Sequence, residues 1–172
     1  MTVSPSFMYT ASIPVFTQML GGLSAVLAKA QAHVDDKKLD ANALLQARLF
    51  PDMFPLTRQV QVACDFAKSV AARLAGVDVP KHDDTEQSFA DLQARIASVL
   101  AFLKGLDSAQ FDAAATREVV SQAGTPKEKR FTGQVYLLNY GMPHLYFHVT
   151  TAYNILRHNG VEVGKKDYVG SY

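Results

Sequence analysis

Residues 141–160 read GMPHLYFHVTTAYNILRHNG. The stretch predicts a long last helix that starts near Thr132-Gly133 and ends at Asn159, with Gly160 in the left-handed position that commonly closes a helix. Pro143 lies inside this helix and should kink it, because proline removes one backbone hydrogen bond. His144 and His148 are four residues apart, so a helix places both imidazoles on one face.

Working outward, three further segments have apolar residues at helical spacing. They cover Pro14–His33, an arm from Asp40 to Gly76 that Pro51 and Pro55 interrupt, and a segment capped by Asp84 and Gln87 that ends near Gly105. Between Asp107 and Gly133 the periodicity fails, and residues 118–122 and 129–132 flank an Ala-Gly-Thr-Pro turn that could form a short hairpin. We therefore expect an all-α fold, an up-and-down four-helix bundle with a short irregular or hairpin insertion before the last helix, in one domain over residues 1–172.

Composition and charge exclude several classes of function. The 172 residues are 48% hydrophobic and 19% charged, with a net charge of +1, which is typical of one soluble domain. No arginine stripe or lysine block is visible, so we expect no nucleic-acid partner. No uninterrupted apolar run approaches the ~20 residues that span a bilayer, and no export signal is visible, so we expect no membrane partner and a cytoplasmic location. The single cysteine, Cys64, lies among apolar residues and reads as a small buried hydrophobe.

Two sets of residues carry a resemblance to known proteins. The motif His144-x-x-x-His148 followed by Leu156-Arg157-x-x-Gly160 resembles the signature on the last helix of the DinB/YfiT-like metalloenzyme superfamily. Residues 47–59, 132–137 and 147–160 resemble more closely an uncharacterised bacterial family within it, one with no known function. The resemblance covers nearly the whole chain. It implies a DinB-like four-helix bundle that is often a homodimer.

The chain departs from that superfamily at the metal site. The superfamily usually takes a third histidine from the second helix, yet Asp40 to Gly76 contains none. Asp52, Gln59 and Asp65 are the candidate oxygen ligands in that arm. The closer family also often has Pro-Asn-Phe where this chain has Pro143-His144-Leu145.

The histidine spacing is nevertheless suited to a divalent metal, zinc or nickel. Two imidazoles supply half of a tetrahedral zinc shell, so a carboxylate must come from elsewhere. Asp52 is the best candidate because the Pro51–Pro55 break can aim it inward, which gives His144, His148 and Asp52 as the predicted metal ligands. Asp52 is equally well read as the N-cap of the following helix.

Other polar residues are candidates for a pocket beside His148. The predicted pocket residues are Arg48, Asp52, Gln59, His148 and Tyr153. Arg48 could also pair with Asp52 across the break, while Asp65 is read as a member of a structural polar pair. His33, His82 and His158 fall at helix ends or linkers and are expected to be solvated.

Three functions remain open at this point. The first is a divalent-metal-dependent enzyme acting on a small molecule, since superfamily members with a full triad resemble thiol transferases or hydrolases. The second is a metal-free bundle that binds a small ligand. The third is a structural, dimer-forming bundle with no catalytic activity.

Overall fold

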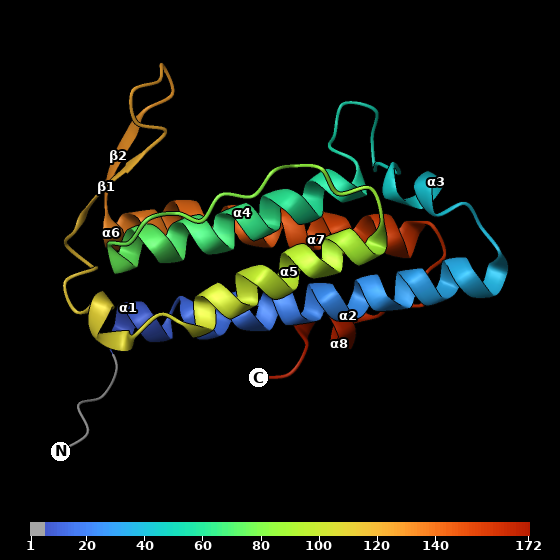
Figure 1. Cartoon of the computed structure of the whole chain (residues 1–172), viewed down its shortest axis with the longest axis horizontal. Coiled ribbons are helices and arrows are strands. Elements are labelled where there is room, and N and C mark those ends of the chain that lie inside the picture. Colours follow the sequence, from blue (N-terminus) through green and yellow to red (C-terminus); the bar gives the residue numbers. More distant parts are fainter. Residues whose placement is uncertain (1–5) are drawn as a thin grey trace.

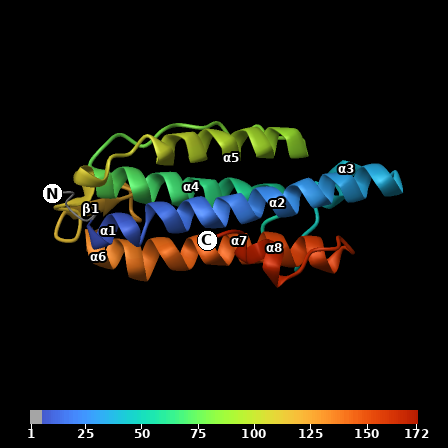
Figure 2. The ribbon, with the colours of Figure 1, turned by 90° about the horizontal axis from the view of Figure 1, so that it is seen from below.

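The computed structural model describes residues 6–172, and most of these residues are helical. Four long helices lie side by side (Figure 1): α2 (Ile13–Lys37), α4 (Leu56–Ala75), α5 (Phe89–Lys104) and α7 (Met142–His158). Helices α5 and α7 each pack on both α2 and α4, and Figure 2 shows them on opposite sides of that pair. The expected helical fold is confirmed, with one two-stranded sheet in addition.

The predicted up-and-down order is wrong, because α4 and α5 run in the same direction (Figure 1). Residues 76–88, the strap, leave the end of α4 and run back along the helices before α5 begins. Thirteen extended residues reach roughly 40 Å, whereas the 20 residues of α4 span only about 30 Å. Hydrophobic periodicity predicts that a helix exists and carries no information on the path between helices.

Helix ends agree with the sequence at some positions and differ at others. Gly76 closes α4 at φ 73° as predicted, and the Asp40 carboxylate caps the short α3 (Ala41–Leu45). The predicted capping pair before α5 is wrong. Ser88 is the N-cap, its hydroxyl accepting a hydrogen bond from the Asp91 amide at 3.1 Å.

Helix α2 is longer than predicted and continues past His33 to Lys37. Its two adjacent glycines have different surroundings. A Cβ on Gly22 would lie 2.6 Å from the carbonyl oxygen of Tyr168, whereas one on Gly21 would meet nothing within 4 Å. Gly22 therefore allows the C-terminal helix α8 (Lys165–Val169) to pack directly on α2.

By length and hydropathy alone, the segment Phe7–Lys37, which contains α1 (Phe7–Thr10) and α2, could cross a membrane. Half of its most apolar window is buried inside the fold. A core helix needs the same apolar composition, so this signal is weak.

The insertion before the last helix is the predicted hairpin. After a 3₁₀ turn (Ser108–Phe111), β1 (Glu118–Ser121) pairs antiparallel with β2 (Lys129–Thr132), with Glu118 opposite Thr132. The chain then continues through α6 (Gly133–Val135) and a π-helical segment (Tyr136–Gly141) into α7. Pro143 was expected to kink a regular helix. Instead it lies in the first turn of α7, directly after the π-helical segment.

Candidate functional site

His148 lies in the seam between α4 and α7 and contacts one of the predicted pocket residues. Its side chain is 7% exposed, and its Nδ1 lies 2.7 Å from Oε1 of Gln59 on α4. The Gln59 amide nitrogen donates to the carbonyl of Phe54 at 3.1 Å, so the amide oxygen is the atom that faces His148. His148 must therefore donate from Nδ1, and its Nε2 keeps a lone pair.

His144, one turn before His148 on α7, also has the proton on Nδ1. Its Nδ1 lies 2.7 Å from the backbone carbonyl oxygen of Tyr140, which can only accept a hydrogen bond. Neutral His144 therefore also keeps an unprotonated Nε2. His144 is half-buried, so this nitrogen belongs to a side chain that solvent reaches in part.

Aromatic rings surround both imidazoles. Phe66 of α4 lies nearly parallel to both, with ring centroids 4.5 Å from His144 and 6.0 Å from His148. The ring centroid of Tyr140 lies 4.4 Å from that of His144. The ring of Phe147 lies edge-on to His148, with centroids 5.2 Å apart. Burial, together with the nearby charges of His144 and Arg58, lowers the pKa of His148 to about 4. His148 is therefore neutral at pH 7.

The structure does not assemble the predicted metal ligands. Asp52 is exposed on the loop between α3 and α4, which projects away from the helices in Figure 1. Over residues 6–172, no three histidine, cysteine, aspartate or glutamate side chains lie close enough together to hold a metal ion. A proline-bounded break fixes a local turn, but it does not set the direction in which the turn points.

Two other pocket candidates also lie away from the histidine pair. Arg48 is exposed and donates to the carbonyl of Met53 at 2.7 Å, so it closes its own loop rather than pairing with Asp52. Tyr153 is half-buried, and its ring packs edge-on against Tyr168 of α8 at 5.8 Å. Of the predicted pocket residues, Gln59 is the one that the structure brings into contact with His148.

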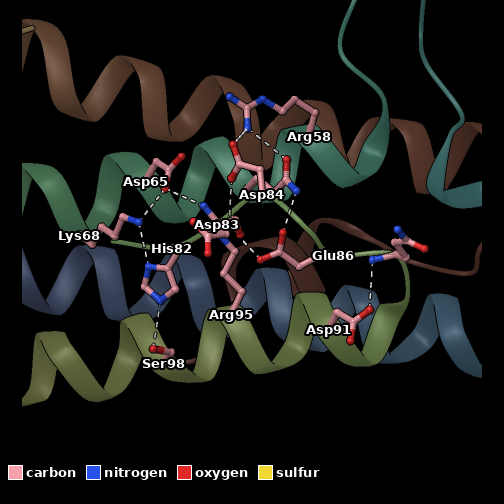
Figure 3. Close-up of polar contacts among 12 residues, drawn as sticks. Arg58, Asp65, Lys68, His82, Asp83, Asp84, Glu86, Asp91, Arg95 and Ser98 are labelled. Atoms are coloured by element: carbon pink, nitrogen blue, oxygen red, sulfur yellow. Dashed lines mark hydrogen bonds and ion pairs between the residues drawn. The ribbon is translucent and has the colours of Figure 1, made fainter. Parts of the chain in front are cut away.

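A second polar cluster, which sequence reasoning missed, joins the strap to α4 and α5 (Figure 3). The Arg95 side chain is only 1% exposed and binds Asp65 at 2.7 Å, Glu86 at 2.8 Å and Asp84 at 3.1 Å. Arg58 also pairs with Asp84, and Gln61 donates to Glu86 at 2.7 Å. The predicted structural role of Asp65 is confirmed, and the signal for its partner was an arginine on the apolar face of α5.

His82 belongs to this cluster and is not simply solvated, contrary to the prediction. It is half-buried, with Nδ1 2.8 Å from the Lys68 ammonium and Nε2 3.1 Å from the Ser98 hydroxyl. An ammonium group only donates, so Nδ1 accepts and Nε2 donates to Ser98. This tautomer cannot take the serine proton, and the pair is therefore not an activated nucleophile.

Cys64 is the other group with nucleophilic chemistry. It is fully buried, and burial raises the pKa of its thiol to about 12. The thiol stays protonated at neutral pH, which agrees with the reading of Cys64 as a small core residue.

Comparison with known proteins supports the resemblance read from the motifs. Residues 8–169 match the family described as a domain of unknown function, DUF1993. The crystal structure of a DinB family member from Shewanella denitrificans is similar, with 49% identity over 95% of this chain and 92% of that chain, and a TM-score of 0.89. No curated protein matches. The chain therefore belongs to the DUF1993 family of DinB-like proteins.

Proposed function

We propose that this protein is a DinB-like four-helix bundle that binds a divalent transition metal, zinc or nickel, through Nε2 of His148 and His144 and presents it to a small molecule. One observation carries the proposal. Both imidazoles donate from Nδ1 to a fixed oxygen at 2.7 Å, that of Gln59 and that of Tyr140. Metal-binding histidines almost always have such a partner, because it fixes the tautomer and the ring orientation.

The charge state of the buried imidazole favours the same function. A metal binds the neutral form of histidine, and at pH 7 a group with a pKa of about 4 has no proton to lose. Gln59 is 1% exposed and donates to the Phe54 carbonyl, so the amide that accepts from His148 is itself oriented by a hydrogen bond.

The donor set fits a metal only in part. Catalytic zinc sites commonly have three protein ligands, whereas the proposed site has two, and the described residues hold no group of three candidate ligands. The Gln59 oxygen is already used by His148, and Asp52 is exposed elsewhere. The other coordination positions would fall to water or to ligand atoms, so we expect weaker binding than in a three-histidine site. A bound metal would lower the pKa of a coordinated water or thiol.

Metal analysis of protein purified without a histidine tag tests this proposal, followed by melting in zinc or nickel. At a hundredfold excess over its dissociation constant, a metal that binds only the folded state adds about 2.7 kcal/mol, or roughly 5–11 °C in Tm. The shift should shrink from pH 7.5 to pH 5.5, where protons compete for the ligands. The shift in Tm should vanish in His148→Ala. It should persist in His158→Ala, because His158 is an exposed residue. An untagged protein without metal, and without a shift in either metal, would end the proposal.

A metal-free small-ligand site is the second candidate, and the aromatic rings favour it. Phe66, Tyr140 and Phe147 offer flat apolar contacts beside the two imidazoles, the mixture typical of small-molecule sites. It predicts that His148→Ala changes ligand affinity in the presence of EDTA, which the metal proposal does not.

A further inference from the structure

A small cavity lies away from the histidine pair, where α4, the end of β1 and the π-helical segment meet. Its volume is about 130 Å³. Its polar lining comes from three elements: Asp65, Ser69 and Arg73 of α4, Ser121 and Gln122 of the hairpin, and Tyr136 and Tyr140 of the π-helical segment. It shares only the rings of Phe66 and Tyr140 with the surroundings of the histidines.

Arg73 brings an uncompensated charge to this cavity. It is half-buried, and over residues 6–172 no carboxylate oxygen lies within 4.0 Å of its guanidinium. Its hydrogen bond goes to a hydroxyl, that of Tyr136, at 2.9 Å. Each of the other six arginines bonds a carboxylate or a backbone carbonyl. Partly buried charges are normally paired, and the hydroxyl partner of Arg73 supplies no counter-charge, so its guanidinium can take a ligand of negative charge.

Tyr136 holds the guanidinium in place. The tyrosine is 1% exposed, and its ring stacks on Tyr140 with centroids 5.6 Å apart. One of the five N–H donors of Arg73 is used by the Tyr136 hydroxyl, which leaves a planar set of donors for a second acceptor. Such a fork matches the oxygens of a carboxylate or phosphate.

Two unusual backbone conformations meet at the same cavity. Gln122 has φ of 55°, an uncommon conformation for a residue with a side chain. The π-helical segment supplies both tyrosines, and π-helical turns occur mostly at functional sites. Gly141 ends this segment, and a Cβ there would lie 2.7 Å from the Val70 side chain on α4, so the close approach needs glycine.

Asp65, the one acidic residue that lines the cavity, is neutralised by two ion pairs. The Asp65 carboxylate lies 2.7 Å from Arg95 and 2.9 Å from Lys68, both buried. The charge left for a ligand is therefore that of Arg73. With a volume of about 130 Å³, the cavity has room for a small anion.

We propose that this cavity binds a small oxyanion, either phosphate or a small carboxylate, with Arg73 as its main partner and Tyr136 as the residue that positions Arg73. The proposal is independent of metal binding at His144 and His148.

Melting of the untagged protein in EDTA tests it, with sodium phosphate or sodium acetate exchanged for sodium chloride at constant ionic strength. Phosphate or acetate should raise Tm by roughly 3–6 °C for each tenfold increase above its dissociation constant. Arg73→Gln should abolish the rise, and Arg73→Lys should keep part of it because the charge remains. Arg130→Gln is the matched control, since this arginine is 60% exposed on β2 and should leave the rise unchanged.

General stabilisation by salts acts on every variant alike, so the difference between Arg73→Gln and Arg130→Gln isolates specific binding. If Arg73→Gln does not fold, Tyr136→Phe keeps the charge and removes its anchor, and it should weaken binding several-fold. A rise in Tm with phosphate alone would identify the ligand class as phosphate, and a rise with acetate alone would identify it as a small carboxylate. Equal melting in phosphate, acetate and chloride would overturn the proposal, as would a rise of undiminished size in both Arg73→Gln and Tyr136→Phe.

Discussion

Replacing Arg95 by alanine should destabilise the fold more than any exposed arginine change, because Arg95 fixes the strap to α4 and α5. Its guanidinium binds Asp65, Asp84 and Glu86, and it also donates to the backbone carbonyl of Asp83 at 3.2 Å. Breaking a buried ion pair by removing one partner commonly costs ~3–5 kcal/mol. The side chains of Asp65 and Asp84 are 35% and 43% exposed and can regain water, which leaves Glu86, at 10%, as the main cost. We therefore expect the lower end, about 3 kcal/mol, or roughly 6–12 °C in Tm.

Urea denaturation followed by circular dichroism at pH 7 measures this cost, with Arg130→Ala as the exposed control. Burial raises the pKa of Glu86, but hydrogen bonds from Arg95 and Gln61 outweigh it and hold the pKa below its usual value. This stabilisation is present above the unfolded-state pKa near ~4.3 and is lost as pH falls through the lower folded-state value. The wild type should therefore lose more stability in acid than Arg95→Ala does. Adding Glu86→Gln to Arg95→Ala should restore part of the stability, because it removes the buried carboxylate charge of Glu86 that the loss of Arg95 leaves unpaired. A cost no larger than that of Arg130→Ala would refute the reasoning.

The remaining predictions concern His148 and the paired glycines of α2. In metal-free protein the unfolded chain takes up a proton near pH ~6.5, whereas folded His148 does so only near its pKa of about 4. Its contribution to stability is thus fully present above pH ~6.5 and falls by at most about 3 kcal/mol as pH drops to 4. Urea curves at pH 7.5 and 4.5 should differ less in His148→Gln than in the wild type, and equal differences would contradict this sign. Gly22→Ala should destabilise by about 1–3 kcal/mol, because its Cβ meets the α8 backbone. Gly21→Ala, with open space, should be neutral or stabilising by up to ~1 kcal/mol, and equal effects of the two changes on Tm would show that α8 does not pack there.

Much of the fold follows from local sequence signals. Apolar periodicity predicts the long helices, Gly76 predicts the end of α4, and the turn residues near Gly124 predict the hairpin. The helix order does not follow, because the strap is held by ion pairs whose partners are distant in sequence. Asp84 illustrates this limit, since its local context suggests a helix cap while its carboxylate is taken by Arg58 and Arg95.

The residues of the candidate sites could be predicted only where helix geometry determines which side chains share a face. Four-residue spacing places His144 and His148 on one face, and Gln59 was a reasonable partner because it is a polar residue in an apolar arm. The prediction that Asp52 points toward the histidines was wrong, because the direction of a loop depends on packing that the sequence does not show. Arg73 gave no usable signal, since basic residues are common in the last turn of a helix and its partner Tyr136 lies in a π-helical segment that periodicity does not reveal.

The Arg95 cluster and the proposed oxyanion cavity are electrostatically connected through Asp65. This carboxylate lines the cavity, and the two cations that neutralise it, Lys68 of α4 and Arg95 of α5, also contact residues of the strap. Without them the cavity would hold one positive and one negative side chain, and an anion would gain little from entering. The strap therefore does more than connect two parallel helices. Its acidic residues hold Arg95 where it compensates Asp65, and that compensation leaves the charge of Arg73 available to a ligand.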